Sequence, residues 1–314
     1  MYEIALSVTE CLRAGTQVDV AWAVETHGFS SRAPAEALAI TPDGTRIGRV
    51  LSGSLDDQLA DLSEQGATGR LVDLRVGEVD AIAAGLACGG DARCLLLPAV
   101  DLPADLWPRL RDREPICLVT RLDGAQVLGT DLFSSETIAD AGPEIANIFG
   151  RGASRTLVST DSVLTVLWPV PKLVLVGSGE VADALAAAAG LLGWSTQTLA
   201  ETSAAGREIA GLAAVDKLIV ISHDLDTAGP ALAAALDGQV GYIGALGSRR
   251  TQQSRADWLA QRGITDLTRI HGPAGLDIGA GPPAEIAVSI LAEALAVRTG
   301  ATATSLRERP GSIH

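Results

Sequence analysis

The stretch "KLVLVGSGEVADALAAAAGLLGW" at residues 172–194 decides the fold of the second half of the chain. A continuous apolar run ends in a glycine turn, and a run of small and apolar residues follows, which is typical of a buried strand leading into a helix. Gly177 permits the tight turn, Gly179 lets a phosphate approach the backbone, and Ala182 stands at the third glycine position. The sequence therefore predicts a dinucleotide-type turn with an anion site at the helix start.

The pattern downstream of this stretch alternates strands with helices. Strand-like runs cover residues 217–222 and 240–247, and helix-like runs cover 229–236, 249–263 and 282–300. This alternation predicts an α/β domain with a parallel, doubly wound sheet. "PVPK" (169–172) marks a boundary, because two prolines interrupt any regular structure there.

Upstream of the boundary, the sequence pattern is that of strands joined in hairpins. Hairpin turns are predicted at residues 42–44 and 123–124, and a third hairpin at 155–168. Ser54 and Asp57 resemble a capping box before a short helix. We predict an N-terminal mixed α+β domain at 1–168, a C-terminal Rossmann-like domain at 171–298, and a disordered polar tail at 299–314.

Composition excludes several classes of function. The chain has 314 residues, 24 basic against 38 acidic, and a net charge of −14, which argues against general binding to nucleic acid or anionic membranes. The charge is uneven: residues 1–170 carry 13 basic and 24 acidic side chains, whereas 171–314 carry 11 and 14. An anionic ligand is therefore better received by the second half. No apolar run approaches the roughly 20 residues of a membrane span, and no signal peptide is recognisable, so a cytoplasmic protein with reduced thiols is expected.

Two further motifs fall at the carboxyl edge of the predicted sheet, where open α/β sheets bind ligands. "SHD" places His223 and Asp224 there; His223 either contacts a ligand or caps a neighbouring backbone group. In "GSRR", Ser248 caps a helix that opens with Arg249 and Arg250, although cations are disfavoured in a first turn by about 0.3–1 kcal/mol each. The two arginines either pair with nearby acids or clamp a phosphate-like oxyanion, the interpretation we favour.

The loop "HGPAGLDIGAGPP" (271–283) carries His271 and Asp277 among four glycines, so they are candidate ligand contacts, unless the loop is only a long connection. In the first half, "GLACGGDARC" sets Cys88 before a glycine pair. This cysteine is either accessible to a metal or a sulfur donor, or a small buried hydrophobe.

Taken together, the residue 171–194 stretch, "SHD", "GYIGALGSRRT" and "IHGPAGLDIGAGPPAEIAVSILAEALAVR" resemble the XdhC/CoxI family. Fainter likeness extends to "THGFSSRAP", "PDGTRIGRVLSGSLDD" and "GLACGG". The resemblance implies a non-catalytic accessory factor that binds molybdopterin-type molybdenum cofactor, supports its sulfuration by a cysteine-desulfurase-like partner, and delivers it to an apo-molybdoenzyme of the xanthine dehydrogenase or carbon monoxide dehydrogenase type. It also implies a homodimer.

The motifs and the resemblance together predict these cofactor-binding residues: Gly177, Gly179, Glu180, His223, Asp224, Ser248, Arg249, Arg250, His271 and Asp277. The chain departs from the family pattern at Ser54, where the family usually has a cysteine, at Glu180, where histidine is common, and at Ala200, where aspartate is common. Cys88 is then the remaining candidate for a molybdenum ligand.

Two other functions remain open at this stage. An NAD(P)-dependent oxidoreductase could use the same turn, but Ala200 supplies no acid for the ribose, and the two lysines, Lys172 and Lys217, complete no hydride-transfer pair. The other is a docking scaffold that holds no cofactor.

Overall fold

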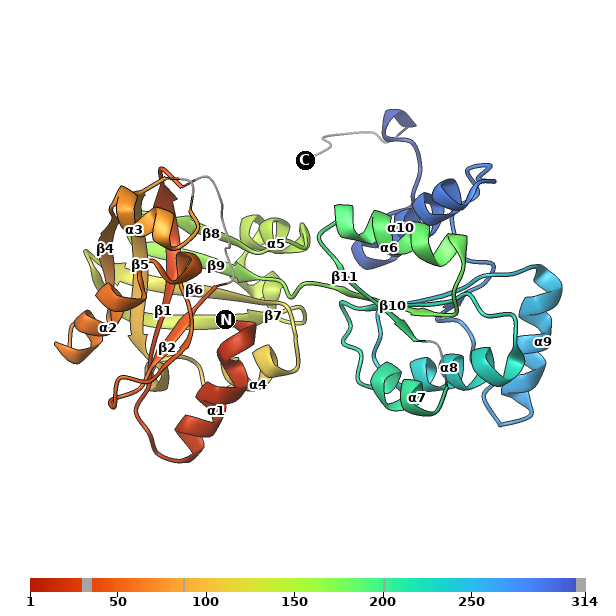
Figure 1. The fold of residues 1–314 in the computed structure, drawn as a ribbon, viewed down its shortest axis with the longest axis horizontal. Coiled ribbons are helices and arrows are strands. Elements are labelled where there is room, and N and C mark those ends of the chain that lie inside the picture. The colour runs from red at the N-terminus through yellow and green to blue at the C-terminus, as the bar shows by residue number, and fades with distance from the viewer. Residues whose placement is uncertain (30–35, 87, 200–201, 309–314) are drawn as a thin grey trace. The chain divides into compact units, whose positions relative to one another are not determined.

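The computed structural model describes residues 1–29, 36–86, 88–199 and 202–308 and divides the chain into two compact units, Met1–Pro169 and Val170–His314 (Figure 1). The chain passes from the first unit to the second between Pro169 and Val170. No helix in the described ranges is long and apolar enough to cross a membrane. The end of the predicted tail, residues 309–314, lies outside the described residues.

The second unit is the α/β domain that the alternating pattern predicted. Its strands are β10 (Lys172–Val176), β11 (Ser195–Leu199), β12 (Lys217–Val220), β13 (Tyr242–Ala245) and β14 (Ile270–His271). Its helices are α6 (Glu180–Leu191), α7 (Thr202–Ala210), α8 (Leu225–Asp237), α9 (Arg249–Ala260) and α10 (Pro283–Thr299), followed by a 3₁₀ turn at Leu306–Glu308.

The five strands form one parallel sheet in the order β11-β10-β12-β13-β14. Helices α7, α8 and α9 pack on one face through an aliphatic cluster that includes Val220, Leu232 and Leu259. Helices α6 and α10 pack on the other face around Leu175 and Ile290, as Figure 1 shows. The order reverses between β10 and β12, which is the switch point at which such sheets bind ligands.

Gly177 and Gly179 meet different requirements in the turn after β10. Both have a backbone φ in the left-handed region, +114° and +117°. A Cβ at Gly177 would lie 2.7 Å from the backbone nitrogen of Ser222, so this glycine is needed for the close approach of the two strand ends. A Cβ at Gly179 would meet nothing within 4 Å, so space for a ligand is open in front of it.

The first unit is a mixed α+β domain around one antiparallel sheet. Its strands are β1 (Asp19–His27), β2 (Leu38–Ile40), β3 (Arg46–Gly48), β4 (Arg70–Val76), β5 (Gly90–Pro98), β6 (Ile116–Asp123), β7 (Gln126–Ser134), β8 (Arg155–Val158) and β9 (Ser162–Leu167). Its helices are α1 (Ala5–Arg13), α2 (Asp56–Glu64), α3 (Glu78–Ala83), α4 (Leu106–Arg111) and α5 (Pro143–Gly150), with 3₁₀ turns at Tyr2–Ile4, Leu51–Gly53, Ala99–Asp101 and Ile138–Ala141.

The nine strands follow the order β3-β2-β1-β5-β4-β7-β6-β9-β8, and the sheet curls until β8 lies against β1. Two hydrogen bonds cross the curl: the Thr156 hydroxyl of β8 donates to the Val24 carbonyl of β1 at 2.6 Å, and the Trp22 indole of β1 donates to the Thr165 hydroxyl of β9 at 3.2 Å. The three predicted hairpins are present as β2–β3, β6–β7 and β8–β9.

The predicted capping box at the start of α2 is wrong. The N-cap is Leu55, without a side-chain hydrogen bond, because the Ser54 hydroxyl donates back to the Leu51 carbonyl at 2.9 Å. Asp56 instead accepts a hydrogen bond from the Val50 backbone nitrogen at 2.9 Å and so holds the turn before the helix.

Candidate functional site at the carboxyl edge of the parallel sheet

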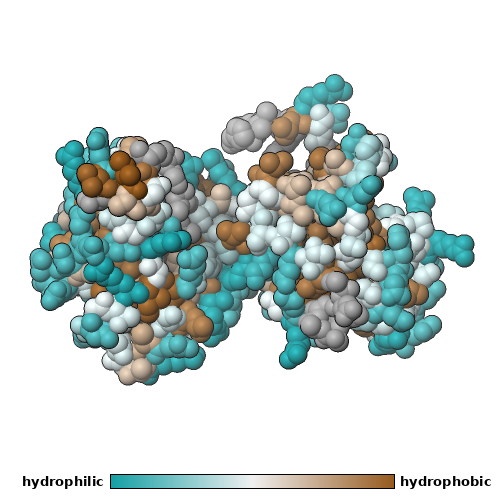
Figure 2. Space-filling view, in the orientation of Figure 1, coloured by the Kyte–Doolittle hydropathy of each residue, from teal (hydrophilic) through white to brown (hydrophobic). Residues whose placement is uncertain are grey.

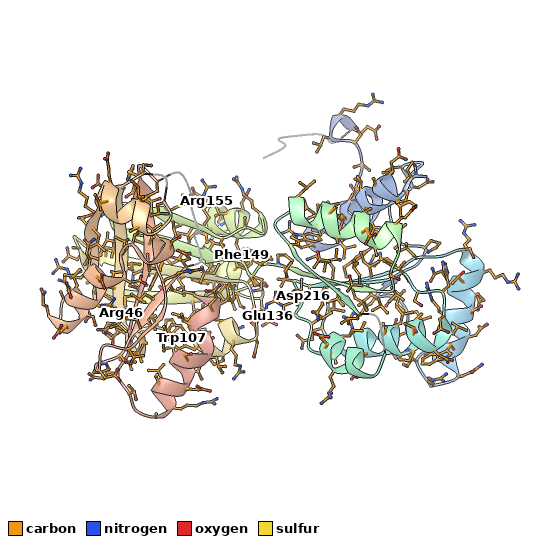
Figure 3. All side chains as sticks on the ribbon, viewed as in Figure 1. Arg46, Trp107, Glu136, Phe149, Arg155 and Asp216 are labelled. Atoms are coloured by element: carbon orange, nitrogen blue, oxygen red, sulfur yellow. The ribbon has the colours of Figure 1, made fainter. Side chains whose placement is uncertain are left out.

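The parallel sheet brings the predicted cofactor-binding motifs to one edge. Gly177 and Glu180 follow β10, His223 and Asp224 follow β12, and Ser248 follows β13, while His271 ends β14. Because the strands are parallel, their carboxyl ends, and the amino ends of the helices that follow, face the same side of the domain. Asp216, labelled in Figure 3, lies before β12 at the opposite edge, where its carboxylate accepts from the backbone nitrogens of Lys172 and Ala213 at 2.9 Å each.

The start of α9 carries the arginine pair as predicted. Ser248 is the N-cap, and its hydroxyl accepts from the Thr251 backbone nitrogen at 3.2 Å. Arg249 and Arg250 are exposed in the first turn, and neither makes an ion pair with another described residue. The alternative that these arginines pair with nearby carboxylates, such as Asp224, therefore has no support within the described ranges.

Charge distinguishes α9 from its neighbours at the same edge. Among the helix starts whose side chains are described, α6 begins with Glu180 and Asp183, α8 carries Asp226, and α10 carries Glu285. These carboxylates offset the positive potential of a helix amino end, whereas the arginines of α9 reinforce it. Of these helix starts, that of α9 therefore has the most positive set of side chains.

Arg255 is a functional candidate that sequence reasoning missed. Its side chain is 2% exposed, and its guanidinium donates to the carbonyls of Ser222 (2.8 Å) and Leu246 (2.6 Å), at the ends of β12 and β13. Its Nε atom is buried without a hydrogen-bond partner in the described structure, and burial lowers the pKa of this guanidinium. Arginine keeps its charge in proteins, so a buried cation, held by carbonyl and amide oxygens and without a described carboxylate partner, lies beside the turn before α9.

His271 lies in a network that also involves two residues without a predicted role. Its ring stacks on Tyr242 with centroids 4.9 Å apart, and its Nδ1 is 3.5 Å from Glu293 Oε1. The other oxygen of Glu293 accepts from the Tyr242 hydroxyl (2.6 Å) and from the Gly275 backbone nitrogen (2.8 Å). Burial, followed by the bond to Glu293, raises the pKa of Tyr242 far above its usual range. This network ties the glycine-rich loop to α10 and fixes the imidazole at the edge.

Of the remaining residues at the edge, Asp224 caps a helix, whereas His223 and Asp277 are exposed. Asp224 is the N-cap of α8, where its carboxylate accepts from the Asp226 backbone nitrogen (3.3 Å) and the Thr227 hydroxyl (2.8 Å). His223 is exposed and caps no backbone group in the described structure, and Asp277 is exposed in the loop. Ala200, where a ribose-binding acid was predicted to be missing, lies outside the described residues.

A cavity of about 410 Å³ adjoins the start of α9. Its lining combines apolar side chains from α8, α9 and the approach to β14 with Arg249, Arg255 and the amides of Gln252 and Gln253. A larger cavity of about 730 Å³ belongs to the first unit, where its lining includes Asp19, Asp43, Asp61 and Glu64 against Arg46, which is labelled in Figure 3. The cavity beside α9 is the better match for an anionic ligand, because none of its described lining residues is acidic.

Cys88, in the first unit, is exposed, and its Sγ lies 2.6 Å from the Gly28 carbonyl oxygen. No group of three or more histidine, cysteine or acidic residues in the described ranges could hold a metal ion. The glycines that follow Cys88 are explained by packing: a Cβ at Gly89 would strike the carbonyl oxygen of Val76, and a Cβ at Gly90 would strike that of His27.

Figure 2 shows an apolar surface over the nearby helix α3, where Val79 and Ile82 are 80% and 70% exposed.

Comparison with known proteins identifies relatives of the second unit and of the whole chain. Residues 173–294 match the family model described as the XdhC Rossmann domain. The chain is 26% identical to PaoD, a molybdenum cofactor insertion chaperone of Escherichia coli (strain K12), over 300 residues that cover 92% of this chain and 86% of PaoD. It is 32% identical to YqeB of the same organism over 153 residues, 42% of this chain, and so spans only 28% of the length of YqeB.

A crystal structure described as a xanthine dehydrogenase from Bacillus halodurans aligns with 96% of this chain and 98% of its own, with a TM-score of 0.42 at 18% identity. That degree of likeness supports no conclusion about function.

Proposed function

We propose that the chain, whose residues 173–294 match the XdhC Rossmann domain, binds molybdopterin-type molybdenum cofactor as cargo. In this proposal it acts as an accessory factor that assists maturation and insertion of the cofactor into an apo-molybdoenzyme, without catalysis of its own. PaoD, the relative that aligns with most of the chain, is named as a molybdenum cofactor insertion chaperone, and this supports the same role here.

The observation that carries the proposal is the arginine pair at the start of α9. Two cations stand in a first turn that repels them, and no described carboxylate pairs with either. Molybdopterin ends in a phosphate, and an arginine guanidinium binds phosphate oxygens with two parallel hydrogen bonds. A phosphate at this position would gain from the helix amino end and from both side chains.

The residues present fit the anionic end of the cofactor better than its metal. Arg249, Arg250 and the buried cation of Arg255 supply positive charge, and the open space in front of Gly179 leaves room along the edge. For molybdenum, Cys88 is the exposed thiol of the chain, but it belongs to the first unit. Ligation by Cys88 is therefore a separate part of the proposal, with its own test.

Further parts of the proposal concern partners and location. We expect the cargo to pass to a molybdoenzyme of the xanthine dehydrogenase or carbon monoxide dehydrogenase type after sulfuration by a cysteine-desulfurase-like protein. We also expect a cytoplasmic homodimer. These expectations rest on the family resemblance.

The direct test replaces both first-turn arginines. In the Arg249→Ala/Arg250→Ala variant, we expect affinity for the cofactor to fall by at least about tenfold, since a hydrogen bond to a charged group contributes roughly 1.5–3 kcal/mol. The melting temperature should stay the same or rise slightly, because two charges that oppose the helix dipole are removed. Anaerobic calorimetry with isolated cofactor and a thermal melt measure the two quantities.

Arg262→Ala is the matched control, because this arginine lies beyond the other end of α9 and its guanidinium stacks 3.4 Å from the centre of the Trp258 ring. It should leave cofactor affinity unchanged. Unchanged affinity in the double variant would show that Arg249 and Arg250 do not bind the phosphate of the cofactor. A large loss of thermal stability in that variant would show that the two arginines stabilise the fold instead.

A further inference from the structure

The cavity beside α9 is lined by a combination of groups that the arginine pair alone does not explain. The apolar part of its lining, which we call its floor, comprises Leu232, Leu259, Leu267, Ile270 and Pro273; of these, Leu267, Ile270 and Pro273 are accessible, and the other two are fully buried. Arg249 and the buried Arg255 line the same space. An apolar cavity that also holds two cations suits a ligand with a flat organic body and an anionic group.

Arg255 is the second, independent sign of a ligand. The residue is 2% exposed, its guanidinium donates to carbonyl oxygens and to the Gln252 side chain, and it makes no ion pair with a described carboxylate. Charged groups are costly to bury unless an opposite charge compensates them. The protein supplies the cation at a cost to its own stability, and a bound anion would offset that cost.

The walls of the cavity are already fixed without a ligand. The Gln252 amide donates to the carbonyls of Ala245 (2.9 Å) and Gly247 (3.3 Å), and its oxygen accepts from Arg255 (3.1 Å). A Cβ at Gly272 would lie 2.7 Å from that same oxygen, so a side chain at this position would displace the Gln252 amide from its place in the wall. Arg249, by contrast, is exposed and unpaired among the described residues, which leaves its guanidinium available to a ligand.

We propose that this cavity binds the phosphate-bearing, heterocyclic part of the cargo: the phosphate beside Arg249 and over the Arg255 charge, and the flat ring against the apolar floor. The inference rests on the proposed function and adds which cavity and which part of the ligand are involved. The volume of about 410 Å³ lies within the roughly 300–1,000 Å³ of typical small-molecule sites. In this arrangement Arg249, which lines the cavity, contributes more than Arg250, which does not.

Two stable probes that differ by one phosphate test the inference on the full chain. They are the fluorescent pterin phosphate released from a molybdoenzyme by acidic iodine oxidation and the same pterin after phosphatase treatment. Fluorescence anisotropy gives the dissociation constant of each. The unmodified protein should bind the phosphorylated pterin at least about tenfold more tightly, as expected for one charge-assisted contact.

Three variants distinguish binding inside the cavity from a general effect of positive charge on the surface. Arg249→Gln should bring the affinity ratio close to one, whereas Arg250→Gln, which removes the same charge from the same turn, should lower it less. Ala256→Phe should weaken both pterins alike, because Ala256 lines the cavity and is half-buried, so a phenyl ring there fills the space.

Equal losses in Arg249→Gln and Arg250→Gln, with no effect of Ala256→Phe, would overturn the inference, as would equal affinity of the unmodified protein for the two pterins. Molybdenum and pterin carried by the anaerobically purified protein report the proposed function separately. Failure of the cavity assignment is therefore distinguishable from failure of cofactor binding.

Discussion

Cys88 differs from the other three cysteines in its surroundings. Cys94 and Cys117 are fully buried strand residues, and burial raises the pKa of both thiols to about 12. Cys11 is half-buried, and Cys88 is exposed. Because the thiolate is the nucleophile, exposure and ionisation decide which cysteine reacts and which is available to a metal.

The first residue-scale prediction concerns the rate of alkylation. At pH 8, a thiol with a pKa of about 12 is ionised to the order of one part in 10⁴. Cys88 should therefore react first with iodoacetamide, Cys94 and Cys117 should stay unmodified in the folded protein, and bound cofactor should protect Cys88. Mass spectrometry of a time course measures this order.

A Cys88 that reacts no faster than the other three, or that gains no protection from cofactor, would be a structural residue. In the proposed role, Cys88→Ser should lower bound molybdenum while leaving the preference for phosphorylated pterin intact, because the arginine site lies in the other unit.

At the scale of elements, the glycine-rich loop after β14 is held to α10 by Glu293. Its carboxylate accepts the buried Tyr242 hydroxyl and the Gly275 backbone nitrogen, and Ser289 of the same helix donates to the Leu276 carbonyl at 2.6 Å. A carboxylate inside a helix thus positions His271 at the sheet edge.

Glu293→Ala should loosen this loop. It leaves a buried tyrosine hydroxyl and a backbone nitrogen without their acceptor, which costs about 1–3 kcal/mol of local stability. Amide hydrogen exchange over residues 272–278 should accelerate by at least about tenfold. Glu285→Ala is the control, because Glu285 accepts only from the exposed Gly281 nitrogen at 3.1 Å. Equal exchange in the two variants would contradict the role given to Glu293.

Most elements of the second unit could be predicted because continuous apolar strands alternate with helices of regular period, and a parallel sheet follows from that order; α7 was missed. In the first unit α1, β4 and β5 were not predicted. In β4, Arg70, Asp73 and Arg75 interrupt the apolar pattern, and tertiary packing decides the strand. Arg255 and Glu293 were missed for a related reason: each is a charged residue inside a helix, and only the fold shows that its side chain is turned inward.

For the whole molecule, the distribution of charge favours an anionic cargo in the second unit. Residues 1–170 carry 13 basic against 24 acidic side chains, whereas 171–314 carry 11 against 14, and three of these 11 are Arg249, Arg250 and Arg255. The rival oxidoreductase function would place a pyrophosphate at the start of α6. Glu180 and Asp183 oppose an anion there, so NADH and NADPH should bind no more tightly than other nucleotides.

The most direct test is the content of the protein purified anaerobically from a molybdate-fed host, with a nicotinamide titration beside it. We predict that the unmodified chain retains molybdenum and oxidisable pterin in near-equal amounts, that Arg249→Ala/Arg250→Ala loses most of both while staying folded, and that NADH and NADPH bind weakly. A protein without molybdenum and pterin that binds either nucleotide with a low micromolar dissociation constant would contradict the account.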